Sequence, residues 1–428
     1  MIRSLAPVAM LLLGTAILLA GQGLQGVLLP VRATLEDFSA LAVGLIGSAY
    51  FIGFTLGSWQ GVALIQRAGH VRVFAGMTAV ASAVPLLHGL WVNLGSWIAL
   101  RMMTGFCFAV LYVVIESWLN ESATNENRGK VFSAYILINM TVLGVGQQMM
   151  LLEDPRELQL FALISVLVSL AAVPVVLSIQ QSPQPVEKVR IDFRKLLHNS
   201  PVGIFGTLVS GLNNGIFWSL AAVFIAAYSD DPNMTASFMT SALVGGAISQ
   251  WPLGWWSDRT DRRWVIVFVA GMGSLVSLAI WLLAPQLSTT ALLALGVAWG
   301  AMAFPTYSIS VAHANDLAGP GEFVQISAGL LLLYGVGAIV GPVLAPLLTG
   351  SLGASGLFFI MAVSFLALML YTLWRLRIRE PIDKASHQDF NESLTAARTV
   401  SVVFEEEMEA LHEEEMEERQ ESTPEKKV

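Results

Sequence analysis

Two ionisable residues stand inside one long apolar run and are the first candidates for chemistry. Arg101 and Glu116 both fall within 96–119, fifteen residues apart. In a helix this spacing places them about 22 Å apart along the axis and about 60° apart around it, so both can face one cavity. A charge in apolar surroundings is costly unless it finds a partner or water, which makes both residues functional candidates. The alternatives are that Arg101 snorkels to a nearby interface and that Glu116 forms a structural ion pair with Arg67 or Arg72.

Amide and aromatic side chains form the second group of candidates. Gln22 and Gln25 share one helix face, and Gln22 and Asn214 each precede a glycine that lets a ligand approach closely. Buried amides can also serve only to join helices, which is the favoured interpretation for Asn139 and Gln250. The other side chains that could line the same site are Asn213, Gln147, Phe108, Tyr112, Trp218, Trp299, Tyr307 and Tyr334.

The elements that carry these residues are apolar segments long enough to cross a membrane. Of the 428 residues, 55% are hydrophobic and 13% are charged, whereas an ordinary soluble domain has about 25% charged residues. This composition excludes a soluble enzyme, a nucleic-acid binder and a secreted disulfide scaffold. The runs are continuous and do not alternate with a period of two, which also excludes a transmembrane barrel. We predict an all-α membrane protein with twelve spans, at about 5–29, 40–64, 73–93, 96–119, 131–152, 158–179, 201–228, 236–256, 264–284, 289–312, 324–348 and 355–375.

The hydrophilic stretches divide the chain into four parts. We predict two six-helix bundles at 1–179 and 201–376, a cytoplasmic linker at 180–200, and a cytoplasmic tail at 377–428. From Asp383 onward the tail holds 14 acidic and 5 basic residues, a balance of −9 (5 − 14), so it accounts for the net charge of −8. The linker carries four bases around an amphipathic pattern, which is typical of a helix lying along a membrane surface.

The distribution of basic residues predicts the orientation. With both termini in the cytoplasm, only Arg32 and Arg156 lie in outer loops, while the other loop bases lie inside. We therefore expect a multi-pass protein of the bacterial cytoplasmic (inner) membrane. The N-terminal segment is interpreted as a retained first helix, because its apolar run continues to Val31 and eleven more spans follow.

Signatures of enzymes and metal sites are absent from the sequence. It contains no Walker loop, no His-Glu-x-x-His, no Gly-x-Ser-x-Gly and no Cys/His ligand set, and Cys107 is its single cysteine. We therefore expect no enzyme activity, no cofactor and no metal. Any transport must draw its energy from an ion gradient or from the gradient of the substrate itself.

An internal repeat relates the two predicted bundles. Two six-helix halves related by an axis along the membrane normal are typical of a transporter, with its site near the midplane between the halves. Sliding the sequence against itself by 192 positions superposes Gln22-Gly23 on Asn214-Gly215, Gly53 on Gly245, Trp59 on Trp251 and Arg67 on Arg259.

The loops that follow the second and eighth spans resemble the signature of the major facilitator superfamily. That signature is Gly, three residues, Asp, Arg, one residue, Gly, and then basic residues. The likeness covers roughly residues 1–380, with departures at Gln66, where the family usually has Asp, and at Asp261, where it has Gly. The Gly-Pro element of many family antiporters is missing from span five. The residues that carry the resemblance are Gly254, Asp258, Arg259, Arg262 and Arg263 after span eight, Arg67, Gly69 and Arg72 in a weaker copy after span two, and Arg101 with Gly105 in span four.

The resemblance implies a secondary active transporter of a small organic molecule that is proton-coupled and works by alternating access between its two halves. We expect a monomer in the lipid bilayer, with no nucleic-acid partner. The alternatives are a passive facilitator of the same fold and a non-transporting sensor or lipid-handling protein. The expected substrate-binding residues are Gln22, Gln25, Arg101, Tyr112, Asn213, Asn214, Trp218 and Tyr307, and the coupling candidates are Arg101 and Glu116.

The two loops are expected to gate the cytoplasmic side through charged networks. Because Gln66 cannot supply a carboxylate, Glu116 is expected to be the acidic partner of the first loop. Asp258 is expected to be the N-cap of the ninth span and a salt-bridge acceptor. The gating residues are therefore Arg67, Gly69, Arg72, Glu116, Gly254, Asp258, Arg259, Arg262 and Arg263.

Overall fold

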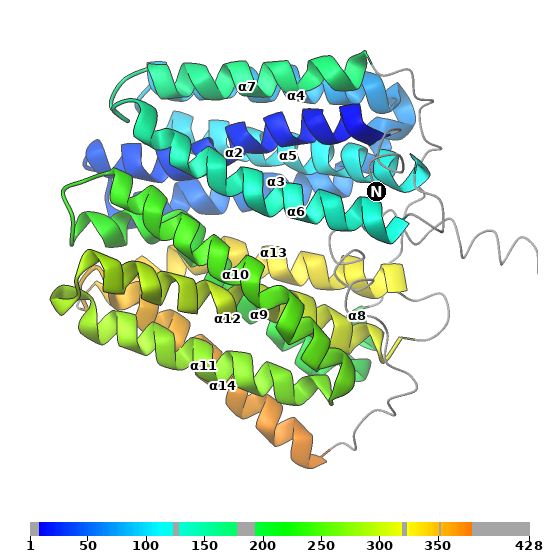
Figure 1. Cartoon of the computed structure of the whole chain (residues 1–428), viewed down its shortest axis with the longest axis vertical. Helices are drawn as coiled ribbons and strands as arrows, with labels where there is room; N and C mark the ends of the chain where they lie inside the picture. Colours follow the sequence, from blue (N-terminus) through cyan, green and yellow to red (C-terminus); the bar gives the residue numbers. More distant parts are fainter. Residues whose placement is uncertain (1–7, 123–127, 178–192, 319–322, 351, 379–428) are drawn as a thin grey trace, which may run out of the picture.

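Twelve long helices run back and forth across the part of the molecule that the structure describes (Figure 1). The computed structural model describes residues 8–122, 128–177, 193–318, 323–350 and 352–378, and within these ranges it has no strand. The first six long helices are α2 (Ala9–Leu35), α3 (Ala40–Ala68), α4 (His70–Leu90), α5 (Leu94–Ser122), α6 (Arg128–Gln148), which continues into the short η2 (Met149–Leu152), and α7 (Gln159–Val176). The second six are α9 (Pro201–Ala226), α10 (Asn233–Arg259), α11 (Arg262–Leu283), followed by η3 (Ala284–Gln286), α12 (Thr289–Asn315), α13 (Phe323–Thr349) and α14 (Gly356–Ile378), and the short α8 (Phe193–Asn199) precedes them.

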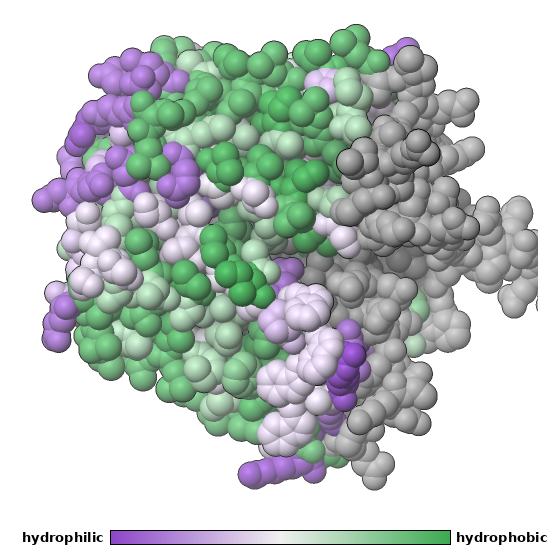
Figure 2. Space-filling view, viewed as in Figure 1, coloured by the Kyte–Doolittle hydropathy of each residue, from purple (hydrophilic) through white to green (hydrophobic). Residues whose placement is uncertain are grey.

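The prediction of twelve spans agrees with these helices. Within the described residues, 11 helices are long and apolar enough to cross a membrane. The remaining long helix, α10, has 27 residues, but polar side chains such as Gln250 lower its hydropathy. Apolar side chains cover much of the visible outer surface of the helices, as a protein surrounded by lipid requires (Figure 2). The chain is thus a multi-pass membrane protein.

The largest difference from the predicted boundaries lies at the end of α2. This helix continues to Leu35, six residues beyond the predicted end at 29. Pro30 lies inside the helix and does not end it, because neighbouring helices in a membrane can satisfy the backbone groups that proline leaves unpaired.

The helices form two bundles with matching internal packing. In the first bundle α2 packs on α6, α3 on α5, and α4 on α7; in the second bundle α9 packs on α13, α10 on α12, and α11 on α14. Gly53 lets α3 touch the backbone of α5 at Met102, and Gly245 lets α10 touch the backbone of α12 at Val297. The repeat superposes these two glycines. The predicted fold of two pseudo-symmetric six-helix bundles is therefore confirmed.

The two bundles are joined at one end of the molecule. We call the end where α2 begins and α14 finishes the terminal end, and the opposite end the loop end (Figure 1). In the loop-end half of α3, the Ser48 hydroxyl donates a 2.6 Å hydrogen bond to the Ile339 carbonyl of α13. On the other side of the interface, Thr240 of α10 donates to the Gln147 Oε1 atom at 2.8 Å, and Gln148 Nε2 donates to the Thr240 hydroxyl at 2.7 Å. These bonds hold the loop-end halves of the bundles together.

Part of the predicted linker is described and packs on the second bundle. Leu196 of α8 is buried against apolar side chains of α12 and α13, whereas the next residue, Leu197, is exposed. The remainder of the predicted linker, and the acidic tail from residue 379, lie outside the described residues. The proposed domain limits therefore stay predictions.

Candidate functional site

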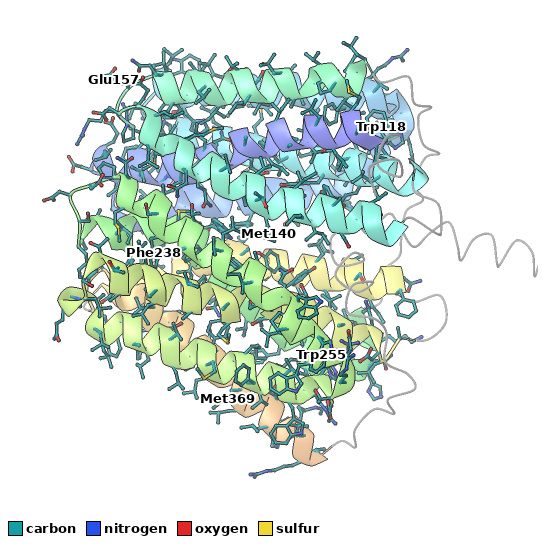
Figure 3. All side chains as sticks on the ribbon, in the orientation of Figure 1. Trp118, Met140, Glu157, Phe238, Trp255 and Met369 are labelled. Atoms are coloured by element: carbon teal, nitrogen blue, oxygen red, sulfur yellow. The ribbon has the colours of Figure 1, made fainter. Side chains whose placement is uncertain are left out.

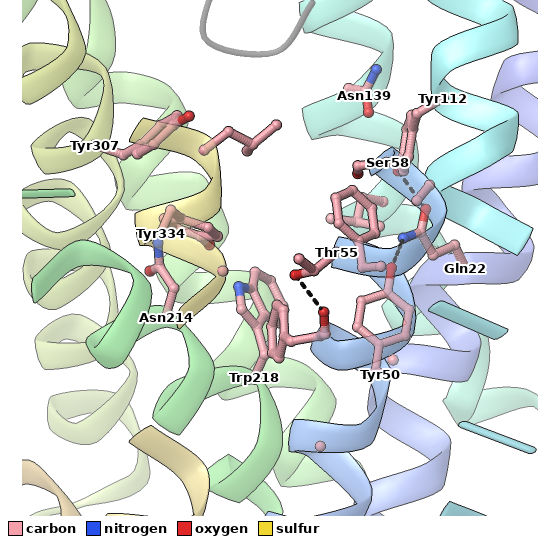
Figure 4. A pocket seen from close by; sticks show the side chains of 18 of the residues that line it. Gln22, Tyr50, Thr55, Ser58, Tyr112, Asn139, Asn214, Trp218, Tyr307 and Tyr334 are labelled. Atoms are coloured by element: carbon pink, nitrogen blue, oxygen red, sulfur yellow. Dashed lines mark hydrogen bonds between the residues drawn. The ribbon is translucent and has the colours of Figure 1, made fainter. Parts of the chain in front are cut away.

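A cavity of about 600 Å³ lies between the two bundles. Its wall is built by α2, α3, α5 and α6 of the first bundle and by α9, α10, α12 and α13 of the second. Figure 3 shows Met140, a lining residue on α6, at the boundary between the bundles. Figure 4 shows the amide and aromatic side chains of the two bundles facing each other across this space.

Gln22 is held by two tyrosines on the first-bundle wall. The Tyr112 hydroxyl of α5 donates a 2.5 Å hydrogen bond to the Gln22 Oε1 atom, and Gln22 Nε2 donates to the Tyr50 hydroxyl of α3 at 3.1 Å (Figure 4). Both ends of the amide are therefore engaged, which fixes its orientation. The predicted residues Gln22 and Tyr112 both line the cavity.

Arg101 also lines the cavity and lies against the same network. Its guanidinium group stands over the Tyr50 ring, 4.5 Å from the ring centroid, and so forms a cation–π contact. Among the described residues that line the cavity, Arg101 is the only cation and Glu116 the only carboxylate. The structure thus places the guanidinium in the cavity wall, and its role in binding or coupling stays a prediction.

Glu116 lies on the terminal-end side of the cavity, and its side chain is buried. The Tyr135 hydroxyl of α6 donates to the Glu116 Oε1 atom at 3.2 Å. The expected ion pair with Arg67 or Arg72 is wrong for this structure: within the described residues neither arginine pairs with an acid, and both are exposed. Both arginines lie near exposed ends of α3 and α4. Leaving their charges exposed there costs less free energy than burying them in an ion pair.

The second-bundle wall combines an amide with stacked aromatic rings. Asn214 lines the cavity and donates a long hydrogen bond of 3.5 Å to the Ser210 hydroxyl. Trp218 stacks on Phe304 with ring centroids 5.8 Å apart, and Tyr307 meets Tyr334 edge to face at 5.0 Å. All four rings line the cavity. Figure 4 shows Asn214, Trp218, Tyr307 and Tyr334 across the cavity from Gln22 and Tyr50.

Four of the expected side chains do not line the cavity, and one of them, Phe108 of α5, is fully buried. Gln25 and Asn213 are each only 1% exposed, and Asn213 Oδ1 accepts a hydrogen bond from the Ser364 hydroxyl of α14 at 2.7 Å. Asn213 therefore faces the interior of its own bundle, because adjacent residues point about 100° apart around a helix. Trp299 is fully buried against Phe217. The substrate-binding predictions for Gln25 and Asn213, and the expected place of Trp299 in the aromatic wall, are corrected accordingly.

Other lining residues went unrecognised or were interpreted differently from the sequence. Asn139 and Gln250, interpreted as helix-joining amides, both line the cavity. One whole face of α3 was missed, although its spacing of four residues is the helical signal that could have revealed it. This face presents Tyr50, Phe54, Ser58 and Val62 to the cavity.

A buried ionic network closes the junction of α10, α11 and α12 at the terminal end. Arg262 donates to Asp316 Oδ2 at 2.7 Å and Oδ1 at 3.3 Å, to Asp258 Oδ1 at 3.0 Å, and to the Ser257 hydroxyl at 2.9 Å. The side chains of Arg262 and Asp316 have no exposed area, and that of Asp258 is 26% exposed. Asp258 is thus an ion-pair acceptor as expected, but Asp316 is the principal partner and was not foreseen. Gly254 is buried one helical turn before Asp258.

The N-cap of α11 is Asp261, which corrects the assignment to Asp258. Asp261 Oδ1 accepts the backbone N–H of Arg263 at 3.0 Å, and its carboxylate pairs with the Arg263 guanidinium at 2.7 Å. Burial by itself would raise the pKa of the Asp261 carboxyl, but the hydrogen bonds from Arg263 and the charges of Arg263 and His313 hold that pKa below its ordinary value. Arg259 instead lies over the Trp255 ring at 4.1 Å, near the terminal end of α10 (Figure 3).

The corresponding turn of the first bundle is a single glycine. Gly69 ends α3 and begins α4, with a φ of 80° that residues with a side chain rarely adopt. Asp261, which the repeat superposes on Gly69, has a φ of −61°.

The fold and the cavity between two pseudo-symmetric bundles define a membrane transporter. The sequence pattern of the Major Facilitator Superfamily matches residues 11–198 and 203–407, so the chain belongs to this family. An uncharacterized MFS-type transporter of Enterobacter sp. is 29% identical over 373 residues, which are 85% of this chain and 94% of that protein. The uncharacterized MFS-type transporter YcaD of Escherichia fergusonii is 27% identical over 371 residues, with coverage of 85% and 94%.

Solved structures of transporters share the fold at low sequence identity. The nucleoside transporter NupG is 12% identical, with a TM-score of 0.74, and the match covers 86% of this chain and 99% of NupG. The transporter FucP in its outward conformation is 13% identical, with a TM-score of 0.56, and the match covers 87% of this chain and 99% of FucP.

Proposed function

We propose that the protein is a secondary active transporter that carries a small organic molecule across the bacterial inner membrane, as a monomer, by alternating access. The observation that carries this proposal is the cavity of about 600 Å³ whose wall both bundles supply. A ligand that contacts both bundles can bias their relative arrangement, because it binds the two arrangements with different affinities. Amides and aromatic rings on both walls can supply those contacts.

We further propose that the terminal end faces the cytoplasm and that this arrangement is the inward-open state. The asymmetry of basic residues supports this orientation. The conformational assignment is supported by hydrogen bonds and close glycine packing in the loop-end halves of α3 and α10, together with lining residues such as Ser58, Val62 and Glu116 toward the terminal end.

Glu116 is the group that we propose to bind the coupling proton. It is the one carboxylate among the described lining residues, and Tyr135 holds one of its oxygens. A carboxylate can gain and lose a proton, whereas an arginine stays charged in proteins. Arg101 is thus the weaker of the two coupling candidates. Protonation of Glu116 would change the charge of the cavity.

The test uses proteoliposomes loaded with a pH indicator and the ligand that gives the largest thermal shift in a metabolite screen. Addition of ligand to the wild-type protein is expected to change the internal pH together with uptake. In Glu116→Gln, counterflow exchange of labelled ligand should continue, while uphill accumulation driven by a proton gradient should be lost. Glu36→Gln is the matched control, because Glu36 pairs with Arg32 and does not line the cavity.

The same assay distinguishes the alternatives. Ligand flux without any proton movement in the wild type would make the protein a passive facilitator. Uphill transport that survives in Glu116→Gln would remove Glu116 from the coupling step. Binding without any flux would contradict transport altogether.

A further inference from the structure

One described lining residue, Arg101, carries a positive charge that no described acidic side chain offsets. Within the described residues, no Asp or Glu lies within ion-pair distance of Arg101. Among the described lining residues the one carboxylate, Glu116, is 15 residues away along α5, which is about 22 Å in a helix and nearly three times the screening length of about 8 Å in physiological salt. Arg101 must therefore be stabilised by something other than Glu116.

Tyr50 supplies only part of that stabilisation. The guanidinium group meets the face of the Tyr50 ring, and the Tyr50 hydroxyl accepts a hydrogen bond from Gln22. Within the described residues, the N–H donors of the guanidinium make no hydrogen bond to a protein acceptor. These donors form a planar fork that matches the two oxygens of a carboxylate. Arg101 can thus bind an anion, and none of the described side chains provides one.

The opposite wall suits a flat apolar group. Trp218 and Phe304 stack there with ring centroids 5.8 Å apart and planes inclined by 25°, and Tyr307 and Tyr334 belong to the same wall on α12 and α13. Rings of this kind bind planar molecules by offset stacking and by burial of apolar area. Asn214 adds an amide whose Oδ1 atom is buried with no hydrogen-bond partner among the described residues.

We propose that the transported molecule is an organic anion with a planar body, whose carboxylate or similar group binds Arg101 while its body lies against Trp218 and Phe304. This inference rests on the proposed function of the cavity and names the class of its substrate. The network of Tyr112, Gln22 and Tyr50 positions the ring beneath Arg101 and thereby aims the guanidinium at the anion. Arg101 acts as a fixed charge and not as a proton carrier.

Ligand charge can be tested with matched probes on the purified full-length protein. We would measure thermal shifts and quenching of tryptophan fluorescence with benzoate, 2-naphthoate and 2-anthroate, and with the neutral primary amide of each acid. The wild type should bind at least one carboxylate about tenfold or more tightly than its amide, since the two have nearly the same size and shape but only the acid carries a negative charge. In Arg101→Gln the acid and its amide should bind within about twofold of each other.

Arg377→Gln is the control, because Arg377 is an exposed arginine that does not line the cavity, and it should keep the preference for the acid. If Arg101→Gln does not fold, the comparison of acid with amide in the wild type still decides the ligand charge. Equal binding of acid and amide by the wild type, no binding by any of the three acids, or a preference for the acid that survives in Arg101→Gln would each overturn the proposal. Transport of a neutral or cationic ligand by the wild type would refute only the anion assignment. Absence of any ligand flux through the wild type would refute the proposed function.

Discussion

Asp261 combines two stabilising roles in one side chain. Its Oδ1 atom caps the N-terminus of α11, and its negative charge pairs with Arg263. A carboxylate at a helix N-terminus also interacts favourably with the helix dipole. Because Asn can supply the cap but not the charge, the two roles can be separated by one substitution.

We expect Asp261→Asn to lower the thermal stability of the protein in a pH-dependent way. The pKa of Asp261 is held below its ordinary value of 3.8, so its charge stabilises the folded state above about pH 3.8 and ceases to do so as pH falls through the folded-state pKa. The variant should melt at a lower temperature than the wild type at neutral pH, and the difference should shrink below about pH 3.8. Melting curves in detergent between about pH 7 and pH 3 measure this. A difference that stays constant with pH would assign the effect to the cap and not to the charge.

At the scale of single residues, the sequence could predict which side chains belong to the site only where helix position and residue type agreed. Gln22 and Arg101 are polar residues in apolar runs, and both line the cavity. Gln25 fits the same description but faces away, because a polar residue type does not reveal the rotation of its helix. Tyr50 was missed because a lone tyrosine in a span does not stand out until its partner Gln22 is known.

At the scale of elements, the junction of α10, α11 and α12 depends on one buried arginine. Arg262 contacts Asp258, four residues before it, and Asp316, at the end of α12. The first partner could be predicted from spacing along the chain. Asp316 is 54 residues away and could not, because only the packing of α11 on α12 brings it near.

We expect Asp316→Asn to destabilise the protein far more than Asp258→Asn. Loss of the Asp316 charge leaves Arg262 buried without its bidentate partner, which should cost about 3 to 5 kcal/mol. Loss of the partly exposed Asp258 leaves that bidentate pair intact and should cost about 1 kcal/mol or less. Thermal or denaturant unfolding in detergent compares the two, with Asp230→Asn as the control because Asp230 is exposed. Equal losses from both substitutions would mean that the network acts as one unit and that Asp316 has no special place in it.

At the scale of the whole molecule, glycines allow the two bundles to meet at the loop end. A Cβ atom at Gly47 of α3 would overlap the Ser219 hydroxyl of α9, and one at Gly44 would overlap the Pro342 carbonyl of α13. Side chains larger than hydrogen therefore cannot occupy these positions unless the bundles move apart.

We expect Gly47→Ala to shift the population toward a state that is open at the loop end. Overpacking of this kind costs about 1 to 3 kcal/mol, which corresponds to about a 5- to 150-fold change in the balance of two states. The measurement is labelling of a single cysteine at Thr55, a lining residue, in a Cys107→Ser background with a membrane-impermeant thiol reagent applied to each face. Loop-end labelling should increase.

Gly76→Ala is the matched control for this substitution, since Gly76 lies in α4 and a Cβ atom there meets nothing within 4 Å. It should leave labelling from both faces unchanged. Unchanged labelling in Gly47→Ala as well would show that the contact with Ser219 does not govern closure.

The overall architecture was the most predictable level of the structure. Runs such as 289–312 are apolar over a length that matches the thickness of a membrane. Because a membrane-spanning helix must have this length and composition, the sequence predicts the number of helices and the approximate position of most of their ends. Hydropathy says little about contacts between distant helices, so the bond from Ser48 to Ile339 had no sequence signal.

The turns at Gly69 and Asp261 limit which amino-acid substitutions each half of the protein can accept. The repeat makes these positions counterparts, yet one has a φ of 80° and the other a φ of −61°. An aspartate at 69 would be strained by the backbone, and a glycine at 261 would remove the carboxylate on which Arg263 depends. Each turn therefore depends on the residue type that it now has. Neither residue can replace its counterpart in the other half, and a change in one turn does not require a matching change in the other.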